Sequence, residues 1–205
     1  MRFFIMMLSV GVFQGCGGCG DGTKCIYKEI VTPAKDPSAV EKEVRLRADK
    51  SVVVRGSLFK GGKKPGDFGW MIEQCQYAKT LFVFNDNEQQ FSAFMAGDRG
   101  PMGCSVGGNN GVIRPFQCRD PPRAAGVPTG SNGAGYASLT PQVKALIDRA
   151  IQHIRKLAIE GDFEYVVFSQ SNQDGHPTLA ANIFAPGMDV RDYIFESLLR
   201  LNPGA

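Results

Sequence analysis

The stretch Thr80-Leu81-Phe82-Val83-Phe84-Asn85-Asp86-Asn87 decides the fold of this 205-residue chain. Its apolar residues follow one another without polar alternation, which is the pattern of a strand buried on both faces of a sheet. A strand is therefore predicted over residues 80–84. The run then ends in Asn85, Asp86 and Asn87, so short polar side chains are expected at the carboxyl end of this strand.

A second apolar run, Tyr165-Val166-Val167-Phe168, has the same character and passes into polar residues from Ser169 onward. Strands are also predicted over 51–55, from its β-branched residues, and over 126–129, ahead of a turn. The carboxyl ends of parallel strands share one edge of a sheet, where ligands of open α/β sheets bind. The polar segments 85–87, 129–132 and 169–176, the last expected as a loop, should therefore converge on one rim.

Helical spacing of apolar residues predicts helices over 141–159 and 190–201, and a short helix over 68–77. Thr140 can cap the long helix, and Pro141 occupies the first helical position, where its missing N–H costs nothing. Together with the strands, these elements predict a single α/β domain over 51–205 with a mixed, partly parallel sheet.

The first fifty residues differ in composition from the rest. Residues 1–20 hold one early positive charge and a short apolar run, which fits either a secretory signal peptide or a disordered leader. That run is too short for a membrane-spanning helix, so no stable membrane span is expected. Residues 21–50 form a charged extension. A secreted and a cytoplasmic location both remain open, as does the oligomeric state.

Charge is spread without the signature of a nucleic-acid binder. The segment from Asp21 to Lys64 contains eleven Lys and Arg and six Asp and Glu. From Pro65 onward the chain contains eleven Lys and Arg and fourteen Asp and Glu. No dense basic stripe with interleaved aromatic residues occurs, so nucleic acid is not expected as a partner. A solvated charged face accounts for the basic segment.

The six cysteines leave the redox compartment open. Cys16-x-x-Cys19 has the spacing of a metal or redox site, but no second Cys or His pair completes a zinc site, so neither metal nor cofactor is predicted. In an exported chain, an N-terminal disulfide is more plausible than a metal. Cys104 and Cys118 flank a glycine-rich loop and have no histidine partner, which argues against a thiol nucleophile.

Ten of the 25 glycines lie between Gly97 and Gly135, a density that indicates backbone close to a ligand. Gly107, Gly108 and Asn109 can offer backbone N–H groups to phosphate oxygens, although a flexible surface loop explains them equally. Arg114 can clamp a phosphate or carboxylate with its guanidinium, or form a structural salt bridge instead.

Polar residues at the predicted strand ends supply the other ligand candidates. Asn85, Asp86 and Asn87 carry donors and acceptors suited to ribose hydroxyls or an exocyclic amine, or they form an Asx turn with their own backbone. Thr129 and Gly130 suit sugar or phosphate contacts, and ordinary turn chemistry also explains them.

Two residues are candidates for catalysis. Asp174 and His176 form an Asp-x-His arrangement in which the carboxylate can orient a general base. A single histidine on a polar loop can equally be incidental.

The run Val54-Arg55-Gly56-Ser57-Leu58-Phe59 resembles the opening strand of macro domains. Ser57 stands where that family usually has an aspartate that contacts adenine. Phe82-Val83-Phe84-Asn85-Asp86-Asn87, the glycine loop and Val127-Pro128-Thr129 also resemble a macro-like group of uncharacterised phage and bacterial proteins.

This resemblance covers residues 51–201 and implies a three-layer α/β/α fold that binds ADP-ribose or a related nucleotide metabolite. It implies that Asn85 and Asn87 lie near the distal ribose. It places 107–109 around the diphosphate and 169–176 in a second phosphate-facing loop. Some macro domains hydrolyse ADP-ribosyl bonds and others only bind, so activity does not follow from the fold. The alternative is an exported, non-enzymatic interaction protein with a surface glycine loop.

Overall fold

Strand β2 (Thr80–Asn87) is the central strand of the sheet, and all of its residues except Asn87 are buried. It extends the predicted strand by three residues, so Asn85, Asp86 and Asn87 belong to the strand itself. The computed structural model describes residues 52–104, 109–173, 175–180 and 184–202. The predicted leader 1–20 and extension 21–50 lie outside the described residues.

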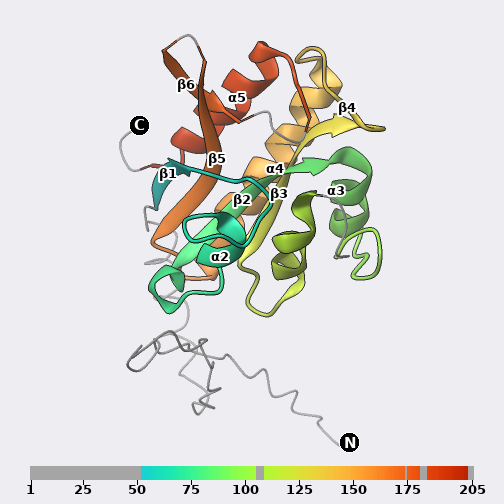
Figure 1. Ribbon diagram of the computed structural model, residues 1–205. Helices are drawn as coiled ribbons and strands as arrows, with labels where there is room; N and C mark the ends of the chain where they lie inside the picture. Colours follow the sequence, from blue (N-terminus) through green and yellow to red (C-terminus); the bar gives the residue numbers. More distant parts are fainter. Residues whose placement is uncertain (1–51, 105–108, 174, 181–183, 203–205) are drawn as a thin grey trace, which may run out of the picture.

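Four neighbouring strands of the sheet are parallel, in the order β1-β5-β2-β3 (Figure 1). The short β4 pairs antiparallel with β3, and β6 pairs antiparallel with the second half of β5. This confirms the predicted mixed, partly parallel sheet. The bounds of the other strands are β1 (Val53–Ser57), β3 (Ala124–Ser131), β4 (Ala134–Gly135), β5 (Tyr165–Gln173) and β6 (His176–Leu179).

Helices cover the sheet on both faces, which confirms the three-layer α/β/α class. One face packs against α3 (Glu88–Met95), α4 (Pro141–Glu160) and α5 (Met188–Leu199). The other face packs against α2 (Phe68–Met71) and the short 3-10 helices η1 (Cys75–Tyr77), η2 (Asn109–Val112) and η3 (Arg114–Cys118). Successive residues of β2 serve the two layers in turn: Leu81 and Val83 face the first, Phe82 and Phe84 the second.

Helix α4 confirms the prediction over 141–159 to within one residue. The Thr140 hydroxyl accepts a hydrogen bond from the Val143 N–H at 3.2 Å, and Pro141 occupies the first turn. Ile147, Ala150 and Ile154 are fully buried against the sheet, as their spacing of three and four predicts.

Two sequence predictions of local structure were wrong. The segment 68–77 is not one helix but α2 followed by η1. The expected loop 169–176 is a β-hairpin, because β5 continues through Gln173 and pairs with β6. The helix predicted over 190–201 is confirmed as α5, with both ends two residues earlier in the sequence, at Met188 and Leu199. Among the described helices, none is long and apolar enough to cross a membrane.

Candidate functional site

The carboxyl ends of the four parallel strands lie along one rim of the sheet. Ser57 of β1 pairs with Ser169 of β5, and β5 in turn pairs with β2, which pairs with β3. The strand ends at Asn85, Thr129 and Ser169 therefore share this rim, as predicted from their parallel order.

An open pocket of about 260 Å³ lies on the rim, between the ends of β1 and β5. Its lining consists of neutral polar residues with glycine and one leucine. These are Gly56, Ser57, Leu58, Gln170, Ser171 and Asn172. Gln170, Ser171 and Asn172 fall in the segment 169–176, which the resemblance placed near a phosphate, and Ser57 stands at the position of the family's adenine-contacting aspartate. None of the six was named singly as a ligand contact.

The pocket lies where the chain leaves neighbouring strands toward opposite faces of the sheet. After β1 the chain runs to α2 on one face, and after β5 and β6 it runs to α5 on the other (Figure 1). Such a switch point opens a crevice between two strand ends, and it is the usual ligand site of open α/β sheets. The sequence alone did not reveal it, because β1 and β5 are more than 100 residues apart and their pairing had to be known first.

Side-chain contacts fix two walls of the pocket. A Cβ at Gly56 would lie 1.8 Å from Gln170 Oε1, so the Gln170 side chain lies across the space that Gly56 leaves open. Ser171 Oγ accepts a hydrogen bond from Arg191 Nη2 at 3.0 Å, and Arg191 Nε donates to the Leu179 carbonyl at 2.8 Å. A hydroxyl can accept and donate at the same time, so the Ser171 O–H can still donate to a ligand.

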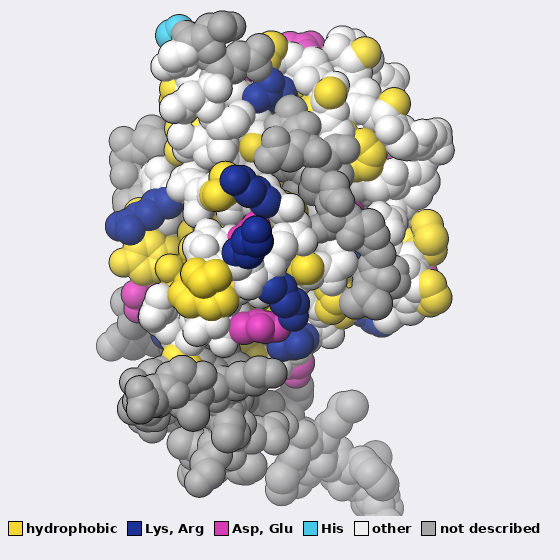
Figure 2. All heavy atoms as spheres, viewed as in Figure 1, with side chains coloured by type: hydrophobic (Ala, Val, Ile, Leu, Met, Phe, Trp, Pro, Cys, Tyr) yellow, Lys and Arg dark blue, Asp and Glu magenta, His cyan; other side chains and the backbone are white. Residues whose placement is uncertain are grey.

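The residues that line the pocket include no charged side chain. Figure 2 shows several Lys and Arg side chains on the face that α2 covers, mixed with hydrophobic side chains. Lys63, in the loop before α2, is paired with Glu73 at 2.9 Å. The lining thus offers hydroxyl and amide groups without a formal charge.

Asn85 lies on the rim but makes internal contacts. The side-chain Nδ2 of Asn85 donates to the Ala180 carbonyl at 2.7 Å. The main-chain carbonyl of Asn85 accepts from Asn110 Nδ2 at 2.6 Å. The side chain is buried. Asn85 therefore ties the segment after β6 and the start of η2 to the end of β2, and its predicted contact with a ribose stays a prediction.

Asp86 and Arg114 form a buried ion pair, the structural alternative raised for Arg114 from the sequence. Both side chains are almost fully buried, at 0% and 2% exposure. Burial raises the pKa of the Asp86 carboxyl, and the Arg114 guanidinium opposes this rise. A Cβ at Gly126 would lie 2.5 Å from Asp86 Oδ2, so the glycine of β3 makes the room that the carboxylate occupies. The pair attaches η3 to the end of β2.

Asn87 is the N-cap of α3, a helix that was not predicted. Its Oδ1 accepts from the Gln89 N–H at 2.9 Å, and Glu88 adds an acidic residue to the first turn. Gln89 Nε2 donates to Ser131 Oγ at 2.9 Å, which joins the start of α3 to the end of β3. An Asn directly before an acidic residue and a helix-compatible run was the signal that could have found α3.

Thr129 and Gly130 are buried where β3 turns into β4. The Thr129 carbonyl accepts from the Tyr136 N–H at 3.0 Å, and a Cβ at Gly130 would lie 2.2 Å from the Ala134 carbonyl oxygen. Thr129 Oγ1 is buried without a hydrogen-bond partner among the described residues. Turn packing therefore explains Gly130, and Thr129 is buried beside it.

The remaining candidates are divided between the rim, the hairpin and segments that are not described. Ser169 is buried on the rim beside Ser57. His176 is exposed at the first position of β6, next to the hairpin turn and not among the pocket-lining residues.

Gly107, Gly108 and Asp174 lie outside the described residues, and Asn109 begins η2 without a described side chain. No group of three or more His, Cys, Asp or Glu side chains in the described part could hold a metal ion.

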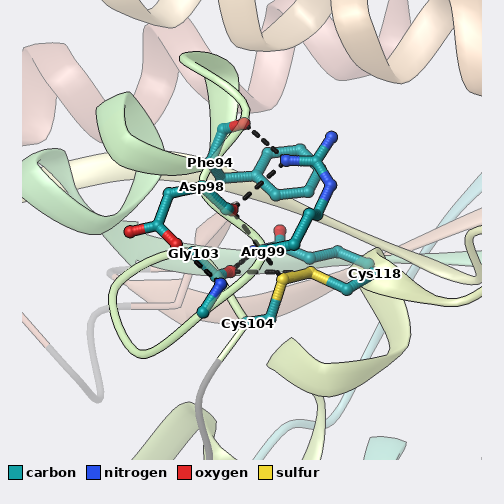
Figure 3. Close-up of a disulfide and its surroundings, with 8 residues drawn as sticks. Phe94, Asp98, Arg99, Gly103, Cys104 and Cys118 are labelled. Atoms are coloured by element: carbon teal, nitrogen blue, oxygen red, sulfur yellow. Dashed lines mark hydrogen bonds between the residues drawn. A yellow bond between two sulfur atoms is a disulfide. The ribbon is translucent and has the colours of Figure 1, made fainter.

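Cys104 and Cys118 are joined by a disulfide, which the sequence did not predict (Figure 3). The bond connects the turn after α3 to the last residue of η3.

The comparisons with known proteins add no relative to this description: no family model matches the chain, and neither a curated protein nor a solved structure matches it significantly.

Proposed function

We propose that this chain binds a small metabolite of the nucleotide class, such as ADP-ribose, in the pocket between the carboxyl ends of β1 and β5. The observation that carries the proposal is the position of the pocket. It lies at the point where the chain leaves β1 and β5 toward opposite faces of a parallel sheet.

The lining supports a ligand that is rich in hydroxyl groups and ring nitrogens. Ser57 and Ser171 offer hydroxyl groups, and Gln170 and Asn172 offer amides that both donate and accept. Leu58 is 46% exposed and adds an apolar surface suited to the face of a base or sugar ring. This combination of a few polar groups and one apolar contact suits a nucleoside better than an inorganic ion.

The volume sets a limit on how much of the ligand the pocket holds. At about 260 Å³ the pocket is just below the range of roughly 300–1,000 Å³ for sites of drug-sized molecules. A nucleoside-sized part of the ligand would occupy it, and the remainder would extend along the rim. The resemblance of the sequence to macro domains supports the same ligand class.

Binding is the proposed function, and hydrolysis of an ADP-ribosyl bond remains a separate prediction. His176 is exposed next to a hairpin turn, at the end of β6 that is farthest from the rim. A His176→Ala protein that keeps ligand affinity but loses turnover would establish the catalytic role. Equal turnover would exclude it.

The Cys104–Cys118 disulfide favours a second candidate, an exported interaction protein without nucleotide affinity. Disulfides persist in oxidising compartments and are rare in the cytosol. This candidate predicts an intact disulfide in the protein as isolated from its cells, and no response to any nucleotide.

A thermal-shift titration of the full chain with ADP-ribose, NAD, AMP and ribose 5-phosphate tests the proposal. A ligand that binds only the folded state adds about 2.7 kcal/mol of stability at a hundredfold excess over its Kd. Ser57→Leu should abolish the shift by filling the pocket. The matched control Ser92→Leu, at an exposed position of α3, should keep it. No shift with any of the four ligands at millimolar concentration would refute the proposal.

A further inference from the structure

We infer that the Cys104–Cys118 disulfide is a redox-sensitive clamp that holds η2 and η3 against the carboxyl end of β2. The two cysteines are 14 positions apart in sequence, and their Cα atoms are 5.9 Å apart. The inference concerns the described residues on either side of the bond and is independent of the proposed ligand.

One end of the disulfide is attached firmly to α3. The turn that leads to Cys104 is closed by the Asp98 N–H, which donates to the Ala93 carbonyl at 2.9 Å, and by the Cys104 N–H, which donates to the Gly100 carbonyl at 2.9 Å. The Arg99 guanidinium lies 4.2 Å from the centre of the Phe94 ring (Figure 3). Because these contacts are local, the turn can keep its structure without the disulfide.

The other end is attached to η3, a short segment held by contacts to other elements: most of its residues are buried, and the Phe116 carbonyl accepts from the Arg123 N–H at 2.9 Å. Helix η3 has only five residues, with Arg114 at its start and Cys118 at its end. Short 3-10 helices have poor hydrogen-bond geometry and little intrinsic stability. Within the described residues, η3 is held by the Asp86–Arg114 pair, by buried Phe116 and by the bond from Gln117 Nε2 to the Gly103 carbonyl at 2.5 Å.

The disulfide and the ion pair therefore anchor opposite ends of η3. Cys118 is fixed to the turn after α3, while Arg114 is fixed to Asp86 beneath the rim. Asn110, just before η3, donates to the Asn85 carbonyl at the end of β2. Loss of the disulfide leaves this end of η3 held by hydrogen bonds alone, chiefly from Gln117 Nε2 to the Gly103 carbonyl, so both contacts to β2 should open more often.

The chemistry of release is an exchange with a dithiol. Cys104 and Cys118 are both half-buried, so a reductant can reach the bond. The thiolate of the dithiol attacks one sulfur, the second thiol resolves the mixed disulfide, and two protein thiols and one oxidised dithiol result. Two electrons pass to the protein, and the η2–η3 segment is released while the domain stays folded.

Hydrogen-exchange mass spectrometry on the full chain tests the clamp. Cys75 is also disulfide-bonded, so dithiothreitol alone does not isolate this bond. The selective variant is the double substitution Cys104→Ser with Cys118→Ser, compared with the oxidised protein. Amides of 109–118 should exchange up to about 100-fold faster, the factor that loop-closure entropy gives for a loop of this length. Peptides from α4 should change much less.

Two outcomes would overturn the inference. Unchanged exchange in 109–118 would mean that the ion pair and Gln117 hold η3 without the disulfide. An equal increase in 109–118 and α4 would mean that the disulfide stabilises the domain as a whole. A variant too unstable for comparison would be replaced by the wild-type protein treated with dithiothreitol, with Cys75→Ser as the control.

Discussion

Removal of the Asp86 charge tests how the rim is attached to the rest of the fold. In an Asp86→Asn protein the Arg114 guanidinium stays buried at 2% exposure, but its carboxylate partner is gone. Breaking a buried ion pair on one side costs about 3–5 kcal/mol, because the remaining charge is uncompensated. Since both groups are almost fully shielded from solvent, the upper half of that range is expected.

Urea denaturation followed by circular dichroism measures this loss as a change in the free energy of unfolding. The matched control is the double variant Asp86→Asn with Arg114→Met. Removing both charges of a buried pair is often close to neutral, so the double variant should recover most of the stability. A single variant that costs less than about 1 kcal/mol, or a double variant no more stable than the single one, would refute a buried pair as the anchor of η3.

Three further predictions concern single sites. Gly126→Ala should cost about 1–3 kcal/mol by urea denaturation, because its Cβ would lie 2.5 Å from Asp86 Oδ2, and no loss would contradict this packing. Asn87→Ala should cost about 1 kcal/mol in the same assay by removing the cap of α3, whereas Asn87→Asp should cost little. Burial lowers the pKa of His153 in the folded protein, so the unfolded chain binds more protons and stability should fall as the pH drops below about 6.5. His153→Gln should weaken this acid sensitivity of the melting temperature, and an unchanged pH profile would contradict the assignment.

The parts of the fold that local patterns determine were predicted well. The continuous apolar runs at 81–84 and 165–168 predicted two buried strands, and these prove to be neighbouring parallel members of the sheet. Thr140, Pro141 and the apolar spacing that follows predicted α4 almost to the residue. In each case burial and backbone geometry act within a few residues, so the sequence carries the information directly.

The parts that were missed depend on contacts between distant segments. β5 continues into polar residues because β6 supplies hydrogen bonds along Gln170–Gln173, and no apolar alternation marks that pairing. The partner of Cys104 is decided by the position of η3, which the Asp86–Arg114 pair helps to hold. The pocket needs β1 beside β5, a neighbourhood that only the strand order reveals.

The candidate site was likewise predicted in part and missed in part. The predicted convergence of strand ends on one rim is confirmed, because it follows from parallel order alone. Parallel order did not predict which side chains face a ligand. Asp86 and Arg114 bind each other, and Asn87 caps a helix. The open pocket belongs instead to Ser57 and its neighbours across β5.

The most direct test of ligand binding at the β1–β5 rim is an NMR titration of the isotope-labelled full chain with ADP-ribose. Binding at this rim should produce saturable shifts of the amide signals of Gly56, Ser57, Gln170 and Ser171, and no shift at the exposed surface of α4. Absence of any shift at millimolar ADP-ribose, or shifts confined to another part of the chain, would contradict it.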